Sequence, residues 1–220
     1  MNYLIDSNRI KRGNFITLEG IDGAGKSSHL TAIVTWLTQR GIACVETREP
    51  GGTDLGEQLR QLILHKNMSS LTELLLLFAA RTQHINEVIE PALARGDWVV
   101  CDRFTDSTRA YQGGGRGMDM AVIEQLAGLL KVNEPDLTMV FDVNLSIASD
   151  RVVSRTTQVN EPMDKFECAP ESFALAVQQT YHKIVVQNPQ RCVLINTNQP
   201  LNTVTQQVLQ ILEYRFGTLK

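Results

Sequence analysis

The chain lacks an excess of charge of either sign and any long hydrophobic run. Its 220 residues carry a formal net charge of −3, whereas general nucleic-acid binders are usually basic. No apolar stretch approaches the roughly 20 residues that span a bilayer. The polar segment 1–13 holds no apolar core of the kind found in a secretory signal. We therefore expect no nucleic-acid partner, no membrane partner and a cytoplasmic location.

Cysteine is scarce as well. The four cysteines are Cys44, Cys101, Cys168 and Cys192. Their spacings match no zinc pattern, and three of them lie in apolar, strand-like runs. Buried free cysteines behave as small hydrophobic residues. We expect free thiols here, not disulfides or a metal site.

What the sequence does contain is a glycine-rich segment between a short apolar run, Phe15–Glu19, and a helical pattern that includes Leu30 and Leu37. The segment matches G-x-x-x-x-G-K-[ST], the phosphate-binding P-loop, through Gly20, Ile21, Asp22, Gly23, Ala24, Gly25, Lys26 and Ser27. In this motif Lys26 reaches the β- and γ-phosphates and the Ser27 hydroxyl binds Mg²⁺. The motif predicts a site for ATP and magnesium, but it leaves the reaction open.

Five apolar runs alternate with helical patterns along the chain. These runs are 15–19, 43–47, 98–102, 137–143 and 192–196. Strands that are apolar throughout are typical of a parallel sheet covered by helices on both faces. We therefore predict an α/β, three-layer P-loop NTPase fold with a five-stranded parallel sheet. A single domain at 14–220 would follow a flexible N-terminal leader at 1–13.

The segments between the strands predict helices and two irregular stretches. The helices are expected at 54–65, 71–95, 120–132, 147–155, 173–186 and 201–216, with a kink at Pro91 in the second. The stretch 111–117 contains four glycines and predicts a flexible loop. The polar segment of roughly 155–170, with Pro162 and Pro170, predicts a mobile lid. Ligands should bind at the carboxyl ends of the strands, beside these segments.

A carboxylate and several arginines are expected at that edge. Asp102 ends an apolar run, the usual place for a carboxylate that binds Mg²⁺ or positions water, although a helix cap or an ion pair with Arg103 is an alternative. Arginines suit phosphate oxygens, and Arg48, Arg81, Arg103 and Arg116 lie in strand-end loops or on a site-facing helix. The lid region adds Arg151, Arg155 and Lys165, which could stabilise a transferring phosphoryl group.

No histidine lies in motif spacing with a serine or carboxylate. A phosphate acceptor needs no general base, because its second pKa is near 6 and it is already nucleophilic at neutral pH. Positioning and charge neutralisation would then supply most of the catalysis.

Several motifs, taken in order, resemble those of bacterial thymidylate kinases. They are F-I-T-L-E-G-I-D-G-A-G-K-S, T-R-E-P-G-G-T, F-A-A-R-T-Q-H, C-D-R-F-T-D-S, A-Y-Q-G-G-G-R-G, P-D-L-T and N-x-N-Q-P-L. The resemblance covers nearly the whole chain from Phe15 onward. It implies transfer of the γ-phosphoryl group of ATP to dTMP, giving dTDP, with Mg²⁺ and in a homodimer. The partners would be these small molecules.

The resemblance also implies residue roles. Asp22 would contact the deoxyribose 3′-hydroxyl, and Arg48 and Arg103 would hold the dTMP phosphate. The remaining roles fall into three groups: Glu49 and Asp102 with Ser27 for magnesium, Phe78 and Arg81 for the thymine ring and its O4, and Ser107, Tyr111 and Gln112 for the nucleoside pocket and rejection of a 2′-hydroxyl.

Two positions depart from the family pattern. The aromatic residue expected four positions before Arg81 is replaced by Leu77, so either Leu77 or Phe78 forms the ring wall. The catalytic lid arginine is replaced in its motif by Lys165, so either Lys165 or Arg155 serves as the catalytic cation.

Other functions remain as alternatives. The chain could phosphorylate another nucleoside monophosphate or a deoxynucleoside, or it could be a P-loop switch ATPase. An N-K-x-D motif, by which GTPases read the base, is absent from the sequence.

Overall fold

A computed structural model describes residues 11–130, 133–159 and 162–217. Its strands are β1 (Phe15–Glu19), β2 (Cys44–Arg48), β3 (Trp98–Asp102), β4 (Leu137–Asp142) and β5 (Cys192–Asn196). They form one sheet in the order β2-β3-β1-β4-β5, and every neighbouring pair is parallel. The predicted parallel sheet is confirmed, and β2 begins and ends one residue later than predicted. Residues 1–10 of the expected leader lie outside the described residues.

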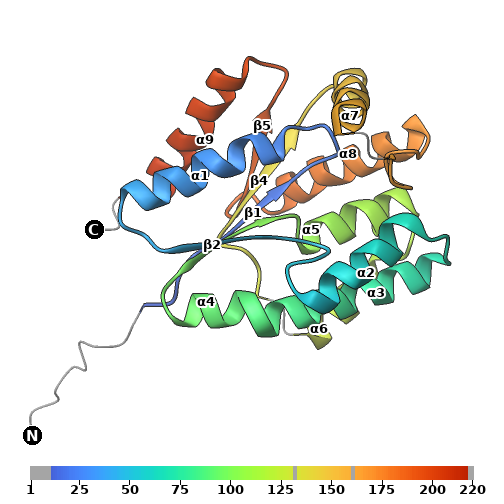
Figure 1. The fold of residues 1–220 in the computed structure, drawn as a ribbon, viewed down its shortest axis with the longest axis horizontal. Coiled ribbons are helices and arrows are strands. Elements are labelled where there is room, and N and C mark those ends of the chain that lie inside the picture. The colour runs from blue at the N-terminus through green and yellow to red at the C-terminus, as the bar shows by residue number, and fades with distance from the viewer. Residues whose placement is uncertain (1–10, 131–132, 160–161, 218–220) are drawn as a thin grey trace, which may run out of the picture.

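Helices cover both faces of the sheet. They are α1 (Lys26–Gln39), α2 (Asp54–His65), α3 (Ser70–His84), η1 (Ile85–Ile89), α4 (Glu90–Ala94), α5 (Thr105–Thr108), η2 (Arg109–Gly115), α6 (Met120–Leu129), α7 (Leu145–Val159), α8 (Glu171–Gln187) and α9 (Leu201–Phe216). Figure 1 shows α1 and α9 together on one side of the sheet. This arrangement confirms the three-layer α/β class. Among the described helices, none combines the length and apolar character needed to cross a bilayer.

The alternating side chains of the central strand explain why both faces are covered. Ile16 and Leu18 are completely buried in a cluster that includes Ile33 of α1. Phe15 points to the other face and packs edge-on against Phe104, with ring centroids 4.8 Å apart. Each buried aliphatic or aromatic side chain contributes roughly 1.5–3 kcal/mol. A strand that is apolar on both sides is stable only between two helical layers.

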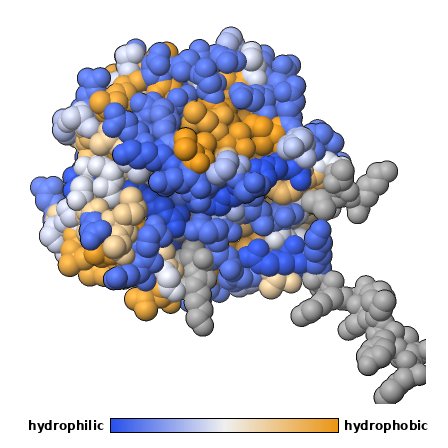
Figure 2. All heavy atoms as spheres, turned by 180° about the vertical axis from the view of Figure 1, so that it is seen from behind, coloured by the Kyte–Doolittle hydropathy of each residue, from blue (hydrophilic) through white to orange (hydrophobic). Residues whose placement is uncertain are grey.

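The surface is mainly hydrophilic but carries apolar patches (Figure 2). Five large apolar side chains are exposed on two neighbouring helices, α3 and α6, including Met120 and Val122 of α6. Leu71 and Leu75 of α3 are 52% and 49% exposed, and Leu129 of α6 is 77% exposed. The same two helices pack together through Leu74 and Ile123 on their buried faces. Both helices therefore have apolar residues on their outer as well as their inner faces.

The predicted long helix contains an irregular turn before its proline. It is continuous from α3 through η1 to α4, and η1 is a π-helical turn that ends at Ile89. Pro91 lacks an N–H group and its ring crowds the carbonyl four residues earlier, which belongs to Glu87. The irregularity therefore lies in the turn before Pro91.

Two expectations for irregular segments were wrong. Residues 111–115 are helical, as part of η2, because their glycines allow close packing against α8: a Cβ on Gly114 would lie 2.1 Å from Thr180 Oγ1. The helix α7 continues to Val159, so the first residues of the expected lid form its last turn. Here the name lid segment is kept for residues 162–170.

The cysteines are free thiols, as predicted. Cys101 and Cys192 are buried, Cys44 is half-buried, and Cys168 is exposed. Burial raises the pKa of the Cys101 thiol well above its usual value. A neutral, buried thiol is a packing residue and not a nucleophile.

Candidate active site

The strand register brings the functional segments together. Asp102 at the end of β3 pairs with Arg48 of β2 on one side and with Leu18 of β1 on the other. All three strands therefore end at one edge, where a cleft of about 950 Å³ opens. Its lining includes Asp22, Gly23, Gly25, Lys26, Ser27, Arg48, Glu49, Arg60, Asp102, Arg103, Arg151 and Arg155. Most of the residues predicted to bind ATP, phosphate and metal thus share one cleft.

The P-loop takes a shape that only glycine allows at two positions. Gly20 has φ 135° and Gly23 has φ 79°. A Cβ on Gly20 would lie 2.4 Å from the carbonyl oxygen of Phe141, and one on Gly23 would lie 2.2 Å from that of Ala148. The loop is therefore held against β4 and α7 by backbone contact. Its amides lie at the N-terminus of α1, where a helix favours anions.

Lys26 is folded into this loop. Its Nζ donates hydrogen bonds of 3.1 Å to the carbonyl oxygens of both Gly20 and Ile21. Burial, and then repulsion by the Arg103 guanidinium, lower the pKa of Lys26. An ammonium group that is desolvated and close to another cation gains strongly from a phosphate ligand.

Arg103 connects the P-loop to the end of β3. It is a non-glycine residue with φ 69°, a strained conformation of a kind that clusters at functional sites. Its Nη2 donates to Asp22 Oδ1 at 2.5 Å and to the Tyr111 hydroxyl at 3.0 Å, and its Nη1 donates to the Gly20 carbonyl at 2.9 Å. Burial raises the pKa of Asp22, but Arg103 and Lys26 outweigh burial and hold that pKa well below its usual range.

Glu19 lies beneath this network and is completely buried. It accepts hydrogen bonds from the Phe104 amide at 2.7 Å, the Ser107 hydroxyl at 2.5 Å and the Tyr181 hydroxyl at 2.9 Å. Burial, and then the charge of Asp106, raise the pKa of Glu19 from 4.5 to about 7. Sequence analysis did not single out this residue, although a charge at the end of an apolar strand was a usable signal.

A smaller cavity of about 80 Å³ adjoins the cleft. The two share Asp22, Glu49, Arg60, Leu64, Arg103 and Asp164, and the smaller one is also lined by Leu77, Arg81, Phe104, Ser107, Thr108, Tyr111, Gln112 and Phe166. The structure therefore brings together Arg81, Ser107, Tyr111 and Gln112, all predicted for the nucleoside pocket.

Phe78 is not on the wall of this cavity. It packs with Leu74 and Ile123 in the core between α3 and α6. Its ring centroid lies 5.1 Å from the guanidinium carbon of Arg81. Leu77 is on the cavity wall instead. Of the two residues left open by the sequence, the helix turns Leu77 toward the cavity and Phe78 toward the core.

Arg81 is held from two sides. Its Nε donates to Glu49 Oε2 at 2.7 Å, and its Nη2 donates to Thr108 Oγ1 at 2.9 Å. Its Nη1 is buried and has no hydrogen-bond partner in the described part of the chain. Gln112 Oε1 is also buried, and no described residue donates to it. One free donor and one free acceptor thus belong to residues that line the same cavity.

The residues present fit a magnesium ion that is held mainly by a nucleotide. The described residues contain no group of three or more His, Cys, Asp or Glu side chains placed to bind a metal. Ser27 and Asp102 both line the cleft, and Asp102 Oδ1 is buried without a partner in the described chain. Hard oxygen atoms are the ligands that Mg²⁺ prefers. Glu49 differs from Asp102 as a possible magnesium ligand, because both of its carboxylate oxygens already accept hydrogen bonds, one from Arg81 and one from His84.

The two lid cations lie in different places. Arg155 lines the cleft and pairs with Glu167. Lys165 contacts Glu73 of α3, with Nζ 2.7 Å from Oε2, and donates to the Lys66 carbonyl at 3.3 Å. The lining of the cleft does not include Lys165.

Arg60 is a site residue that sequence analysis missed. It lines both cavities and donates to the Pro50 carbonyl at 2.9 Å. Burial, and then repulsion by Arg48, lower its pKa. The available signal was its spacing: Arg60 lies three residues before the buried Ile63, on the same face of the helix.

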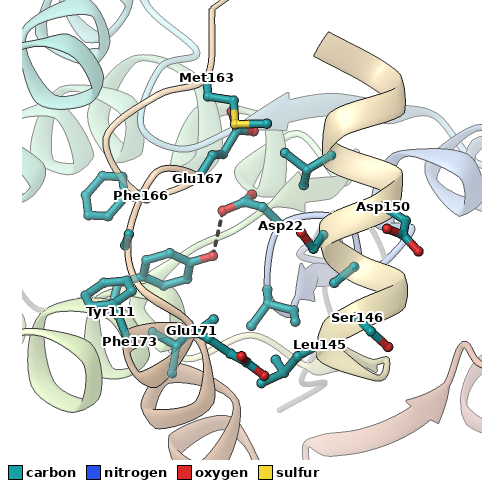
Figure 3. A pocket seen from close by; sticks show the side chains of 17 residues that line it. Asp22, Tyr111, Leu145, Ser146, Asp150, Met163, Phe166, Glu167, Glu171 and Phe173 are labelled. Carbon is teal, nitrogen blue, oxygen red and sulfur yellow. Dashed lines mark hydrogen bonds between the residues drawn. The ribbon is translucent and has the colours of Figure 1, made fainter. Parts of the chain in front are cut away.

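A third cavity, of about 490 Å³, lies between the P-loop, α7 and the lid segment. Figure 3 shows the hydrogen bond from the Tyr111 hydroxyl to Asp22 at its edge, with Phe166 and Phe173 beside Tyr111. The rings of Tyr111 and Phe166 pack edge-on, with centroids 5.5 Å apart. The lid segment therefore contacts Tyr111, which also lines the smaller cavity, through an aromatic cluster.

The chain is similar to known proteins along most of its length. A family model described as thymidylate kinase matches residues 18–208. The thymidylate kinase of Methylobacillus flagellatus is 51% identical over 91% of this chain and 97% of its own length. That of Bordetella pertussis is 46% identical over 90% of this chain and 93% of its own.

A solved structure gives the same result for the fold. The crystal structure of thymidylate kinase from Ehrlichia chaffeensis matches with a TM-score of 0.75 and 35% identity, covering 92% of this chain and 99% of the other. Because the family model spans most of the chain and curated relatives share about half its residues over nearly their whole length, this chain belongs to the thymidylate kinase family.

Proposed function

We propose that this protein transfers the γ-phosphoryl group of ATP to dTMP, giving dTDP, with ATP on the P-loop and dTMP in the smaller cavity. The observation that carries this assignment is the pair of unpartnered atoms, Arg81 Nη1 and Gln112 Oε1. A buried donor and a buried acceptor on residues that line one cavity complement the O4 and N3–H of a thymine ring. A buried polar group without a partner costs about 1–3 kcal/mol, so a ligand that pairs both atoms would be favoured in this cavity.

The phosphate of dTMP would face the arginines of the cleft. Arg48 and Arg103 are the predicted phosphate ligands, and we add Arg60, which lies between the two cavities. Asp22 would bind the 3′-hydroxyl group, because it lies at the meeting point of the cavities beside Tyr111. Leu77 would form the ring wall, with Phe78 supporting Arg81 from behind.

Catalysis then rests on positioning and charge. The dTMP phosphate is already nucleophilic at neutral pH, since its second pKa is near 6. Ser27 and Asp102 would hold Mg²⁺ and its waters, and the ion neutralises charge on the β- and γ-phosphates when bound. We assign Glu49 to orienting Arg81, because both its oxygens are already used.

The helix α7 contributes one cation to the reaction. Arg155 lines the same cleft as Lys26 and would stabilise charge on the transferring phosphoryl group. Lys165 points to Glu73 and would hold the lid segment in place.

We also propose a homodimer. The outer faces of α3 and α6 expose Leu71, Leu75 and Leu129. Burial of apolar side chains of this kind is the main favourable contribution to association. The predicted cytoplasmic location stays a prediction.

A coupled assay with ATP and Mg²⁺ tests the assignment. We expect ATP turnover that depends on dTMP, weaker turnover with dUMP, and little with dCMP, AMP or thymidine. Equal ATP hydrolysis without any acceptor would support a switch ATPase instead. Preference for another monophosphate would keep the reaction class but change the substrate.

A further inference from the structure

A buried carboxylate of α3 connects the lid segment to the smaller cavity. Glu73 is 1% exposed. Gln112 Nε2 donates to its Oε1 at 2.8 Å, while Arg116 Nη2 and Lys165 Nζ lie 3.1 and 2.7 Å from its Oε2. A weaker contact of 3.3 Å joins Arg116 Nε to Oε1. Glu73 thus contacts Gln112 of η2, Arg116, which follows η2, and Lys165 of the lid segment at the same time.

The charge on Glu73 decides how the amide of Gln112 is oriented. Burial raises the pKa of Glu73, but hydrogen bonds from Lys165, Gln112 and Arg116 outweigh burial and lower that pKa overall. An ionised carboxylate accepts hydrogen bonds and donates none. The NH₂ group of Gln112 must therefore face Glu73, and its carbonyl oxygen must face away.

That carbonyl oxygen is the buried atom to which no described residue donates. Gln112 itself lines the smaller cavity. Because the NH₂ group of Gln112 is turned toward Glu73, the carbonyl oxygen on the other side of the amide is the atom left to accept from a bound base. Thymine and uracil carry a donor, N3–H, at the matching position, whereas N3 of cytosine is an acceptor.

We propose that Glu73 is a positioning residue for base selection, which fixes the amide of Gln112 so that the cavity accepts bases with an N3–H group and rejects cytosine. This inference rests on the proposed function, since it concerns the acceptor nucleotide of the same reaction. Rejection arises because an acceptor placed against an acceptor leaves two buried groups unpaired. Glu73 acts through Gln112 and does not touch the base.

The same contacts predict what an isosteric neutral side chain would do. In Glu73→Gln, the side-chain oxygen would take the Oε2 position, where Lys165 and Arg116 supply two cationic donors. The new NH₂ group would then occupy the Oε1 position and face Gln112. Gln112 would have to turn its carbonyl oxygen toward residue 73 and its NH₂ group toward the base, so the hydrogen-bond polarity at the Gln112 position would reverse, while the Arg81 donor would be unchanged.

The experiment compares kcat/KM for dTMP and dCMP, with ATP and Mg²⁺, in the wild type and Glu73→Gln. We expect the dTMP/dCMP ratio to fall by roughly tenfold or more, with kcat/KM for dCMP itself rising. General damage to the fold would lower both values together. Glu213→Gln is the matched control, because Glu213 is 54% exposed and pairs only with Arg40 among the described residues; its ratio should equal that of the wild type.

A second variant, Gln112→Met, tests the contact of Gln112 with the base whether or not Glu73→Gln folds, and the double variant tests whether Glu73 acts through Gln112. Gln112→Met removes the amide and should lower the ratio without any gain for dCMP. In the Gln112→Met background, adding Glu73→Gln should change the ratio no further, because Glu73 acts through Gln112. An unchanged ratio in either single variant, or equal losses for both nucleotides, would overturn the inference. A wild type that does not phosphorylate dTMP would instead overturn the proposed function.

Discussion

Arg103 Nη2 lies 2.5 Å from Asp22 Oδ1, although 81 positions separate the two residues in the chain. The pair joins the strand-end loop of β3 to the P-loop. Arg103 reaches Asp22 from a left-handed backbone, at φ 69°, which costs of order 1–3 kcal/mol and has to be maintained by surrounding contacts. A guanidinium held in this way is fixed in direction before any phosphate arrives.

Arg103→Lys keeps the positive charge at this position but should still lower the activity of the enzyme strongly. Lysine lacks the planar fork that now contacts Asp22, Tyr111 and the Gly20 carbonyl. We expect kcat/KM for dTMP to fall by about tenfold or more, measured by steady-state kinetics. Arg109→Lys is the control, because Arg109 binds Asp106 and Glu124 outside both cavities. Similar kinetic losses in both variants would contradict the special role of Arg103.

Replacing Arg155 and replacing Lys165 should change different kinetic parameters. Arg155→Ala should lower kcat by about tenfold to a hundredfold, because Arg155 lines the cleft of the P-loop. Lys165→Ala removes the contact with Glu73 and should act mainly on KM for dTMP. Initial rates over a range of dTMP concentrations distinguish the two effects. The reverse pattern would return Lys165 to the catalytic role.

Glu19 should make stability depend on pH. Its pKa is raised from 4.5 to about 7 by burial and by Asp106. Between these values the folded state keeps a proton that the unfolded state has lost, so the contribution of Glu19 to the free energy of unfolding falls as pH rises through this window. It is constant above about pH 7 and below about pH 4.5.

Urea unfolding of the wild type and of Glu19→Gln, followed from pH 4 to pH 9, checks this prediction. The difference in unfolding free energy, wild type minus variant, should decrease across that window and then level off. A flat difference would show that Glu19 ionises normally in the folded protein, and a difference that grows with pH would show a lowered pKa; either result would contradict the prediction.

Gly114 should tolerate no side chain. A Cβ there would lie 2.1 Å from Thr180 Oγ1, so Gly114→Ala must push η2 away from α8. We expect a loss of about 1–3 kcal/mol in the free energy of unfolding. Gly128→Ala in α6 is the matched change, since nothing lies within 4 Å of its Cβ position, and it should stabilise by up to about 1 kcal/mol. Chemical denaturation of both variants measures the difference, and equal stability would contradict the packing argument.

Local patterns were enough to predict the elements of the fold. The apolar strand runs, the P-loop and the alternation of strands with helices gave the parallel sheet, because each depends on short-range spacing. The family motifs pointed to the thymidylate kinase family, and most of the predicted site residues line one of two adjoining cavities. The glycines at 113–115 led to the wrong prediction of a flexible loop, since their role is close packing against α8.

The sequence alone thus determined the class of fold, the phosphate-binding loop and the family. Tertiary structure decided between residues that the sequence left equivalent. Leu77 and Phe78 are adjacent and both apolar, so only the rotation of α3 against α6 shows which one lines the cavity. Likewise, the partner of Lys165 is Glu73, 92 positions earlier. Contacts between residues so far apart depend on how the helices pack, and no local pattern records that packing.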